Sequence, residues 1–240
     1  MPRFFVEQIR GDRVVLTDEN AAHIGKSLRM RVGEVITLSD ANGTDCEARI
    51  VRFGDGTVET EVLEERQNLS EPTVAVTLYQ ALPKVGKFEV VVQKAVELGV
   101  TRVVPMLTSR CVSRPDEKSK QKKIERYNKI ALEAAKQSGR GIIPVVDSVM
   151  EYGQVLKELP RYRHSILFYE EGGERICDIL PEDVNELAIV IGSEGGFSPE
   201  EVEQAKQAGA KIGTLGPRIL RCETAPVAAL AAIMFYSKNL

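Results

Sequence analysis

The sequence predicts two domains of different class: a small β-barrel in residues 1–70 and an α/β domain with a parallel sheet in residues 73–240. Residues 1–70 contain short apolar runs separated by turn residues, which is typical of a small barrel. From residue 73 onward, apolar strands alternate with segments of helical periodicity, which indicates a parallel sheet with helices on both faces. The polar stretch 68–72 lies between the two patterns and is the expected linker.

The barrel prediction depends on runs in which apolar and polar residues alternate. Such alternation places the apolar side chains on one face of a strand. Asn42-Gly43 lies between two of these runs and is a strong hairpin signal. A short helix is expected at 19–27. The expected strands are 4–6, 13–16, 34–38, 46–51 and 57–62.

The second domain is predicted from the order of its elements. The segment 87–98 has a helical apolar face, and Gly99 is suited to end that helix. A long basic helix is expected at 118–138. The apolar face of the first helix consists of Phe88, Val91, Val92, Ala95, Val96 and Leu98. The expected strands are 74–82, 102–107, 165–169, 187–191 and 211–215, and the further helices are 199–208 and 223–238.

Composition excludes several classes of protein. The four cysteines and two histidines are dispersed along the sequence, so we expect no metal site. The first ten residues show no secretory signal, and the longest uncharged apolar run, 225–236, is too short to span a bilayer. We therefore expect a cytoplasmic protein with free thiols and no membrane segment.

The net charge of −3 conceals a strong segregation of charge. Residues 110–140 contain ten Lys and Arg against four Asp and Glu, whereas residues 170–206 contain two against eleven. A local basic surface can neutralise phosphates whatever the total charge of the chain. A solvated helix face explains the basic run equally well.

The most informative motif runs from a buried strand into the glycine-rich turn 192–196 and then into a helix. Ser198 is the expected N-cap, Pro199 the first helical residue, and Glu201 completes a capping box. Three glycines in five residues let a ligand approach the backbone at the carboxyl end of a strand. The alternative is a tight structural turn without a ligand.

Phosphate-binding motifs are absent from the sequence. No GxGxxG pattern occurs, and Gly25-Lys26-Ser27 lacks the earlier glycine of a Walker A motif, because Asn20 stands there. Glu194 would also repel a pyrophosphate from the glycine-rich turn. Dinucleotide and ATP binding are therefore disfavoured.

A second strand–turn–helix junction follows at 215–225, Leu-Gly-Pro-Arg-Ile-Leu-Arg-Cys-Glu-Thr-Ala. Ile219 and Leu220 can supply an apolar wall, and Arg218 or Arg221 can contact a phosphate or a base edge. Because two such junctions lie close together in sequence, we expect them to share one pocket.

These two segments, the QKAVELGV helix end and the MPRFF start resemble the ribosomal RNA small subunit methyltransferase E family of the SPOUT methyltransferases. The similarity covers essentially the whole chain. It implies an α/β trefoil-knot domain with a parallel sheet and an N-terminal PUA-like, RNA-binding β-barrel. It also implies a homodimer that uses S-adenosyl-L-methionine to methylate N3 of one uridine in 16S ribosomal RNA, within an assembled small subunit.

The resemblance further implies site residues in three loops. Ile191, Leu215 and Leu220 are expected to enclose the adenine ring, and Arg221 to stabilise charge on the uracil oxygens. Glu223 either accepts the N3 proton or holds Arg221, and the helix macrodipole alone also explains an acid there. The expected cofactor-binding residues are Leu167, Tyr169, Glu170, Ile191, Gly192, Glu194, Gly195, Gly196, Leu215, Gly216, Ile219, Leu220, Thr224 and Ala225.

RNA contacts are expected from basic side chains, which as a set would make RNA binding sensitive to salt. Each one alone is also explained as a solvated charge. The expected RNA-binding residues are Arg3, Lys26, Arg29, Arg31, Lys84, Lys87, Arg110 and Arg114, with the lysines of 118–129 as further candidates.

Three other functions remain open at this point. A SPOUT methyltransferase can act on another RNA nucleotide. A non-enzymatic RNA-binding or assembly protein would keep the barrel and the basic helix but would need no cofactor loops. A nucleotide-dependent enzyme would use the glycine-rich turn for phosphate, which the missing phosphate motifs oppose.

Overall fold

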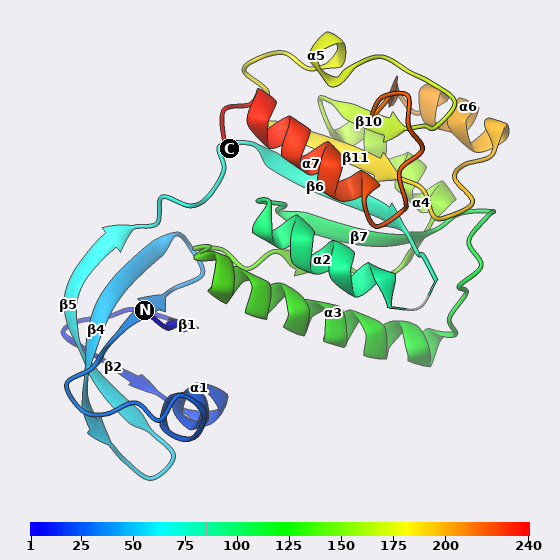
Figure 1. Cartoon of the computed structure of the whole chain (residues 1–240). Coiled ribbons are helices and arrows are strands. Elements are labelled where there is room, and N and C mark those ends of the chain that lie inside the picture. Colours follow the sequence, from blue (N-terminus) through cyan, green and yellow to red (C-terminus); the bar gives the residue numbers. More distant parts are fainter. Residues whose placement is uncertain (85) are drawn as a thin grey trace. The chain divides into compact units, whose positions relative to one another are not determined.

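The computed structural model describes residues 1–84 and 86–240, and the chain divides into two compact units (Figure 1). The first unit contains Met1–Glu71 together with Ala135–Ile143. The second contains Pro72–Ala134 and Pro144–Leu240. Each unit has a sheet of its own.

The sheet of the first unit has five strands in the order β1-β3-β4-β5-β2. The β1–β3 pair is parallel and the other pairs are antiparallel. Two register shifts between β4 and β5 let these long strands bend. The sheet is thus the expected small barrel, in the form of a half-barrel. The strands are β1 (Arg3–Phe5), β2 (Arg13–Leu16), β3 (Val35–Ser39), β4 (Thr44–Phe53) and β5 (Val58–Gln67).

The predicted hairpin and helix of this unit are confirmed. The turn between β3 and β4 contains Asn42-Gly43, and the Asp40 carboxylate accepts hydrogen bonds from the amides of Asn42 (2.8 Å) and Thr44 (2.9 Å). The helix consists of α1 (Asp18–Ala22), which continues into one π-helical turn, η1 (His23–Ser27).

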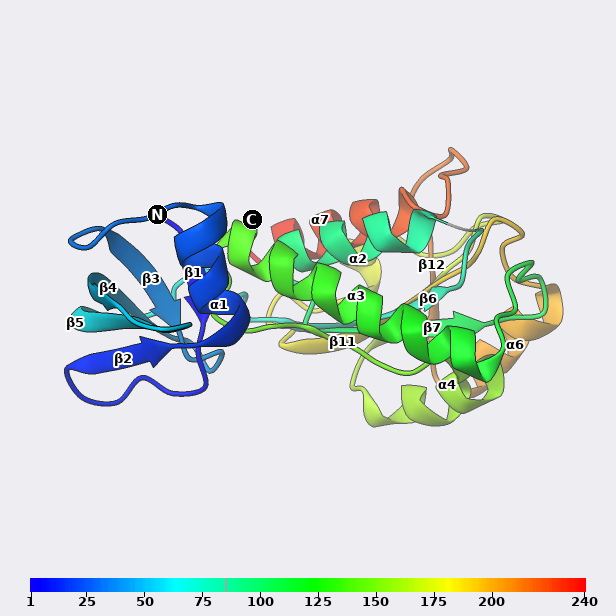
Figure 2. The same ribbon diagram turned by 90° about the horizontal axis from the view of Figure 1, so that it is seen from below.

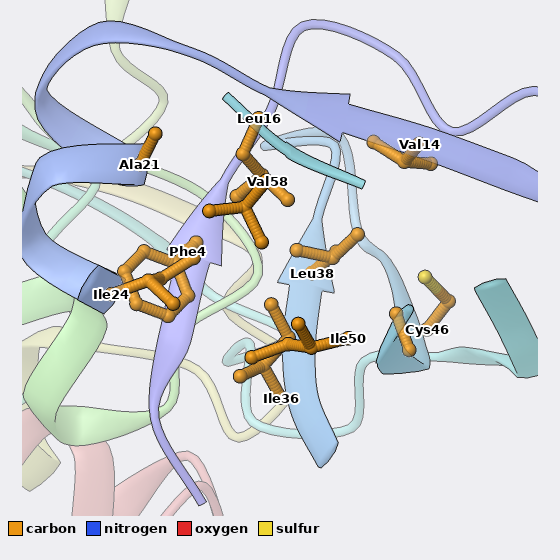
Figure 3. Close-up of a cluster of buried hydrophobic side chains, with 11 residues drawn as sticks. Phe4, Val14, Leu16, Ala21, Ile24, Ile36, Leu38, Cys46, Ile50 and Val58 are labelled. Carbon is orange, nitrogen blue, oxygen red and sulfur yellow. The ribbon is translucent and has the colours of Figure 1, made fainter. Parts of the chain in front are cut away.

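Alternation along the strands builds the core of the first unit. Its largest side chains point toward one another (Figure 3), and none of them is more than 2% exposed. They come from β1, β2, η1, β3 and β4, so the helical segment covers the concave side of the sheet. These side chains are Phe4, Leu16, Ile24, Ile36, Leu38 and Ile50.

A polar cluster fixes the edge of the first unit. The Arg3 guanidinium donates to both carboxylate oxygens of Asp45, at 2.6 and 2.7 Å. Asn68 donates to the same carboxylate at 2.8 Å and to the Gly139 carbonyl at 3.0 Å. The cluster thus ties the segment after β5 and the segment 135–143 to the sheet.

The sheet of the second unit is entirely parallel and has the order β12-β10-β11-β6-β7-β8, with β9 also paired to β7. The long predicted strands are confirmed. Three elements before β10 were not predicted from the sequence: β8, β9 and α4. The strands are β6 (Ala75–Ala81), β7 (Arg102–Leu107), β8 (Val145–Val146), β9 (Met150–Glu151), β10 (Ser165–Phe168), β11 (Glu186–Ile191) and β12 (Lys211–Gly213).

Helices cover both faces of this sheet, as predicted. Helices α2, α3 and α7 lie on one face and α4 and α6 on the other (Figures 1 and 2). Helix α7 packs against α2, so the chain crosses back over the sheet after β12. The helices are α2 (Lys87–Glu97), α3 (Glu117–Ser138), α4 (Tyr152–Glu158), which runs into the 3-10 turn η2 (Leu159–Arg161), α5 (Ile176–Ile179), α6 (Pro199–Gln207) and α7 (Ala225–Tyr236).

The strand order reverses between β6 and β11. The chain first builds outward from β6 through β7 and β8, and then returns to place β11 and β10 on the other side of β6. In open parallel sheets, such a reversal opens a crevice at the carboxyl ends of the strands, where ligands bind. The predicted glycine-rich turn follows β11 and therefore lies at this reversal.

Two further features concern membranes and metals. Within residues 1–84 and 86–240, no helix is both long and apolar enough to cross a bilayer. The same residues contain no cluster of three or more His, Cys, Asp or Glu side chains arranged to hold a metal ion.

The Arg3–Asp45 pair leads to a stability prediction. Burial raises the pKa of Asp45, but hydrogen bonds from Arg3 and Asn68 outweigh it and hold the pKa below its usual range. Because Asp45→Asn removes charged hydrogen bonds from Arg3 and Asn68, it is expected to lower the free energy of unfolding by about 2 kcal/mol in urea denaturation. The carboxylate stabilises the fold only when ionised, so this difference should shrink as the pH falls below about 4.

The matched control is Glu61→Gln. Glu61 lies 3.7 Å from Arg49, and both side chains are about half exposed (48% and 47%). An exposed pair contributes at most about 1 kcal/mol, so this variant should unfold almost like the parent. Equal effects of the two substitutions would show that the Arg3–Asp45 pair does not stabilise the first unit.

Candidate functional site

Three loops meet at the carboxyl edge of the second sheet. They follow the neighbouring strands β10, β11 and β12. We call residues 192–196 the glycine loop and residues 214–224 the C-terminal loop. Together with the residues after β10, they line a cavity, which we call the apolar cavity. The sequence prediction that the two junctions share one pocket is confirmed.

Most of the residues expected to bind a cofactor line this cavity. They are Tyr169, Glu170, Ile191, Gly192, Gly196, Leu215, Gly216, Ile219, Leu220 and Ala225. The other expected residues lie elsewhere: Leu167 is fully buried in β10, Thr224 precedes α7, and Glu194 and Gly195 line a neighbouring cavity. The sequence analysis did not select four further lining residues as cofactor ligands: Phe168, Ser193, Arg218 and Cys222.

Close packing of the loops explains the glycines. Gly196 has φ +63°, and a Cβ there would meet the Glu170 carboxyl group, whose carbon would lie 2.8 Å away. A Cβ on Gly195 would lie 2.9 Å from Cβ of Arg110. A Cβ at Gly196 would therefore push the end of the Glu170 side chain aside, and a Cβ at Gly195 would crowd Arg110.

The glycine loop is held from both ends. Its turn is closed by the Gly196 amide, which donates to the Ser193 carbonyl at 3.0 Å. Beyond it, the predicted capping box of α6 is confirmed: the Glu201 amide donates to Ser198 Oγ (3.2 Å) and the Ser198 amide to Glu201 Oε2 (2.9 Å). Arg110 donates to the Gly195 carbonyl at 2.9 Å. The loop is thus preformed.

Ser193 carries a polar atom without a partner inside the site. Its side chain is 8% exposed, and among the described residues nothing forms a hydrogen bond with its hydroxyl. An unpaired buried hydroxyl costs free energy unless a ligand or water bonds to it. Ser193 lines both the apolar cavity and its neighbour.

The neighbouring cavity, which we call the polar cavity, contains opposite charges. The ammonium of Lys87 lies 3.1 Å from Glu194 and 3.1 Å from Glu223. The polar cavity shares a wall with the apolar cavity, formed by Glu170, Ser193, Gly196, Ile219, Leu220 and Cys222. Its other lining residues are Lys87, Glu194, Gly195 and Arg221.

The acids next to Lys87 are held in the ionised form. The Cys222 thiol donates to Glu223 at 3.1 Å, and this bond, with the ion pair to Lys87, lowers the pKa of Glu223. Burial raises the pKa of Glu194, but its own amide, Lys87 and the Lys84 amide outweigh burial and lower it. Burial and the neighbouring Glu223 raise the pKa of Cys222 to about 12, so its thiol stays neutral.

The expected catalytic residues therefore have different surroundings. Arg221 is exposed and lines the polar cavity. Glu223 pairs with Lys87, and the ion pairs among the described residues include none between Glu223 and Arg221. Of the two roles expected for Glu223, proton acceptor or holder of Arg221, the second has no ion pair behind it among the described residues, and the first stays a prediction.

The basic residues expected to bind RNA fall into two groups. Lys26, Arg29 and Arg31 are exposed around the end of η1. The side chains of the others form hydrogen bonds or ion pairs within the protein, with one exception. Lys84 forms a hydrogen bond only through its backbone amide, which donates to Glu194 at 3.2 Å. The engaged side chains are Arg3 with Asp45, Lys87 with Glu194 and Glu223, Arg110 with the Gly195 carbonyl, and Arg114 with the Thr108 carbonyl.

Comparison with known proteins identifies the family. Residues 70–234 match the RNA methyltransferase domain, and residues 16–63 match the RNA methyltransferase PUA domain. The ribosomal RNA small subunit methyltransferase E of Bacillus subtilis (strain 168) is 34% identical over 254 residues, which cover 100% of this chain and 98% of the relative. The chain belongs to the ribosomal RNA small subunit methyltransferase E family. The resemblance found in the sequence is thereby confirmed.

Other members of the family agree with this assignment. The methyltransferase E of Mycobacterium tuberculosis (strain CDC 1551 / Oshkosh) is 31% identical over 96% of this chain and 90% of its own length. The crystal structure of the Neisseria gonorrhoeae member, bound to S-adenosyl methionine, is 32% identical, covers 98% of this chain and 97% of its own, and has a TM-score of 0.89. The fold is thus the expected SPOUT-type trefoil-knot α/β fold with a PUA-like domain.

The packing of the glycine loop leads to a second stability prediction. Gly196→Ala should lower the free energy of unfolding in urea, because it adds a clash with Glu170 to a left-handed backbone. Gly209→Ala is the matched control, since Gly209 has φ +91° and no atom within 4 Å of the added Cβ. The control should cost about 1 kcal/mol for the backbone alone, and Gly196→Ala up to about 1 kcal/mol more, because the Glu170 side chain must leave its preferred rotamer.

A second-site change separates the clash from the backbone strain. Glu170→Ala removes the group that the new methyl would meet, so it should recover part of the loss in a Gly196→Ala background. Identical unfolding of the Gly196 and Gly209 variants would contradict the proposed packing.

Proposed function

We propose that this protein transfers a methyl group from S-adenosylmethionine to N3 of a uridine in 16S ribosomal RNA, within an assembled small subunit in the cytoplasm. Membership of the ribosomal RNA small subunit methyltransferase E family supports methylation of small-subunit RNA. The main support for S-adenosylmethionine as the donor is the cavity at the ends of strands β10, β11 and β12. The Neisseria relative binds S-adenosyl methionine.

The residues of the apolar cavity suit this donor. Ile191, Leu215 and Leu220 supply apolar walls of the kind that enclose an adenine ring. Glu170 offers a carboxylate suited to ribose hydroxyls, and the unpaired Ser193 hydroxyl offers a further hydrogen bond. The glycine loop leaves its backbone open for close approach.

The acceptor nitrogen must lose its proton for the transfer to occur. The bound donor supplies a methyl carbon whose bond to sulfur breaks, with its electron pair staying on sulfur, as the new bond to N3 forms. We assign the N3 proton to Glu223, whose carboxylate is ionised and next to Lys87 in the C-terminal loop. Arg221 stays protonated and stabilises the negative charge that develops on the uracil oxygens.

Basic side chains away from the cavities are proposed to bind the ribosomal RNA. Lys26, Arg29 and Arg31 project from the PUA-like unit without an intervening acid in the sequence. Lys84 and the lysines of 118–129 add positive charge beside the catalytic unit. Arg3, Arg110 and Arg114 instead hold parts of the protein together, so their contribution to RNA binding is secondary.

Helix α7 supports the proposal of a homodimer. The helix is apolar over its whole circumference, which is typical of a helix buried on all sides. Phe235 is nevertheless 73% exposed and borders an apolar groove with Ala228, Ala232 and Tyr236. Sedimentation equilibrium at micromolar concentration should give twice the mass of the chain, and the mass of a single chain would contradict the dimer.

Methylation of small ribosomal subunits from a strain that lacks this gene tests the proposed function directly. Wild-type protein with S-adenosylmethionine should add one methyl group, and mass mapping should place it on N3 of a uridine in 16S ribosomal RNA. A methyl group on another nucleotide would support a different RNA target. The absence of methylation, with RNA binding retained, would support a non-enzymatic RNA-binding protein.

Arg221→Ala tests, in the same methylation assay, whether Arg221 stabilises the charge on the uracil oxygens. Removing one charge-stabilising donor typically lowers kcat by a factor on the order of 10²–10³. Because Arg221 is exposed and lines only the polar cavity, the Kd for S-adenosylmethionine, measured by titration calorimetry, should stay close to that of the parent. Equal losses of affinity and turnover would show that Arg221 binds the donor instead.

A further inference from the structure

Lys87 has surroundings that do not suit a surface lysine. It is the first residue of α2, where the positive end of the helix macrodipole disfavours a cation. Its ammonium lies 3.1 Å from Glu194 and 3.1 Å from Glu223. Glu194 belongs to the glycine loop and Glu223 to the C-terminal loop, so this one side chain joins both loops of the site.

The charges around Lys87 argue against contact with an RNA phosphate. One ammonium between two ionised carboxylates forms a group with a net negative charge. Such a group repels a phosphate at close range. Hydrogen bonds to Glu194 and then to Glu223 raise the pKa of Lys87, so the ammonium stays protonated whatever else enters the site.

Lys87 donates its third N–H only to a weak acceptor. An ammonium has three donors, and the two carboxylates take two of them. Among the described residues, its other hydrogen-bond neighbour is the sulfur of Cys222, a weak acceptor at 3.8 Å. Lys87 lines the polar cavity together with Arg221, so an oxygen acceptor inside the cavity can replace the weak bond to sulfur.

We propose that the polar cavity receives the acceptor base and that Lys87 is a catalytic residue, which donates its third N–H to a carbonyl oxygen of that base. This inference rests on the proposed function. A uracil carries one carbonyl oxygen on each side of N3–H, and Lys87 and Arg221 supply one cation for each oxygen. As the N3 proton passes to Glu223, the negative charge spreads onto both oxygens, where the two cations stabilise it.

The same arrangement favours uracil over cytosine. Cytosine presents an amino group, a donor, where uracil presents its O4 oxygen. One of the two cations would then face a donor and stay unpaired inside the cavity, which disfavours binding. Lys87 is thus a residue for recognition and catalysis, and Glu194 and Glu223 hold it in place.

The test compares Lys87→Met with Lys84→Met, which removes an equal charge three residues away. The Lys84 side chain is exposed, and its bond to Glu194 comes from the backbone amide, which the substitution keeps. Three quantities are measured on small subunits from the deletion strain: kcat, the Kd for S-adenosylmethionine and the salt dependence of RNA binding. Lys87→Met should lower kcat about a hundredfold, with donor affinity and salt slope unchanged. Lys84→Met should instead reduce the salt slope by about one.

Several results would overturn the inference. A Lys87→Met variant that keeps the parent kcat but has a smaller salt slope would show that Lys87 contacts phosphate. A parallel loss of donor affinity would place Lys87 in the donor site. Lys87→Arg keeps a cation between the carboxylates and should lose much less activity than Lys87→Met, so equal losses would contradict the role of the charge. A thermal unfolding midpoint close to that of the parent confirms that the variants are folded.

The activity of the parent protein shows whether a negative result concerns only Lys87 or the whole proposed function. If the parent binds S-adenosylmethionine and methylates a uridine but Lys87→Met does so equally fast, only the role of Lys87 is wrong. If the parent itself methylates no uridine, the proposed function is wrong, and the inference is overturned with it.

Discussion

The site depends on how closely three loops pack where neighbouring parallel strands end. A Cβ on Gly173 would lie 2.7 Å from the backbone of Gly213, and a Cβ on Gly213 would lie 2.6 Å from Ile166. Gly196 faces the end of the Glu170 side chain, which can move aside more easily than a backbone can. Glycine at these positions lets backbones approach each other at distances that any side chain would prevent. Because the strands fix where the loops start and the glycines fix how closely they pass, the cavities exist before a ligand enters.

Charge then divides this edge of the sheet into two environments. The apolar cavity has walls of aliphatic side chains and suits a flat, largely apolar ring. The polar cavity contains Lys87 and Arg221 beside Glu170 and Glu194, so neither sign of charge predominates there. A neutral, polar base suits such a surface better than a phosphate does. The exposed basic side chains that suit phosphates lie elsewhere, among them Lys26, Arg29 and Arg31.

Much of the fold could be predicted from the sequence because its long elements have clear periodicity. Strands β6, β7 and β11, helices α2, α3, α6 and α7, and the capping box at Ser198 lie where the sequence places them. The elements that were missed are short. Strands β8 and β9 have two residues each, α5 has four and α4 has seven, which is too few to show a clear period. Such elements form because a neighbouring strand or loop supplies their partners.

The sequence by itself determined that the glycine loop and the C-terminal loop share one cavity, because each directly follows a strand, and the carboxyl ends of parallel strands lie at one edge of a sheet. It did not determine what the charged side chains do. In the sequence alone, Arg3 and Lys87 are both explained as solvated surface charges. In the fold, Arg3 pairs with Asp45, 42 positions away, and Lys87 pairs with two glutamates from separate loops. A long charged side chain takes its partner from whatever the folded chain brings near it. Such partners are distant in sequence, so only the tertiary structure decides between a solvated charge and a member of the site.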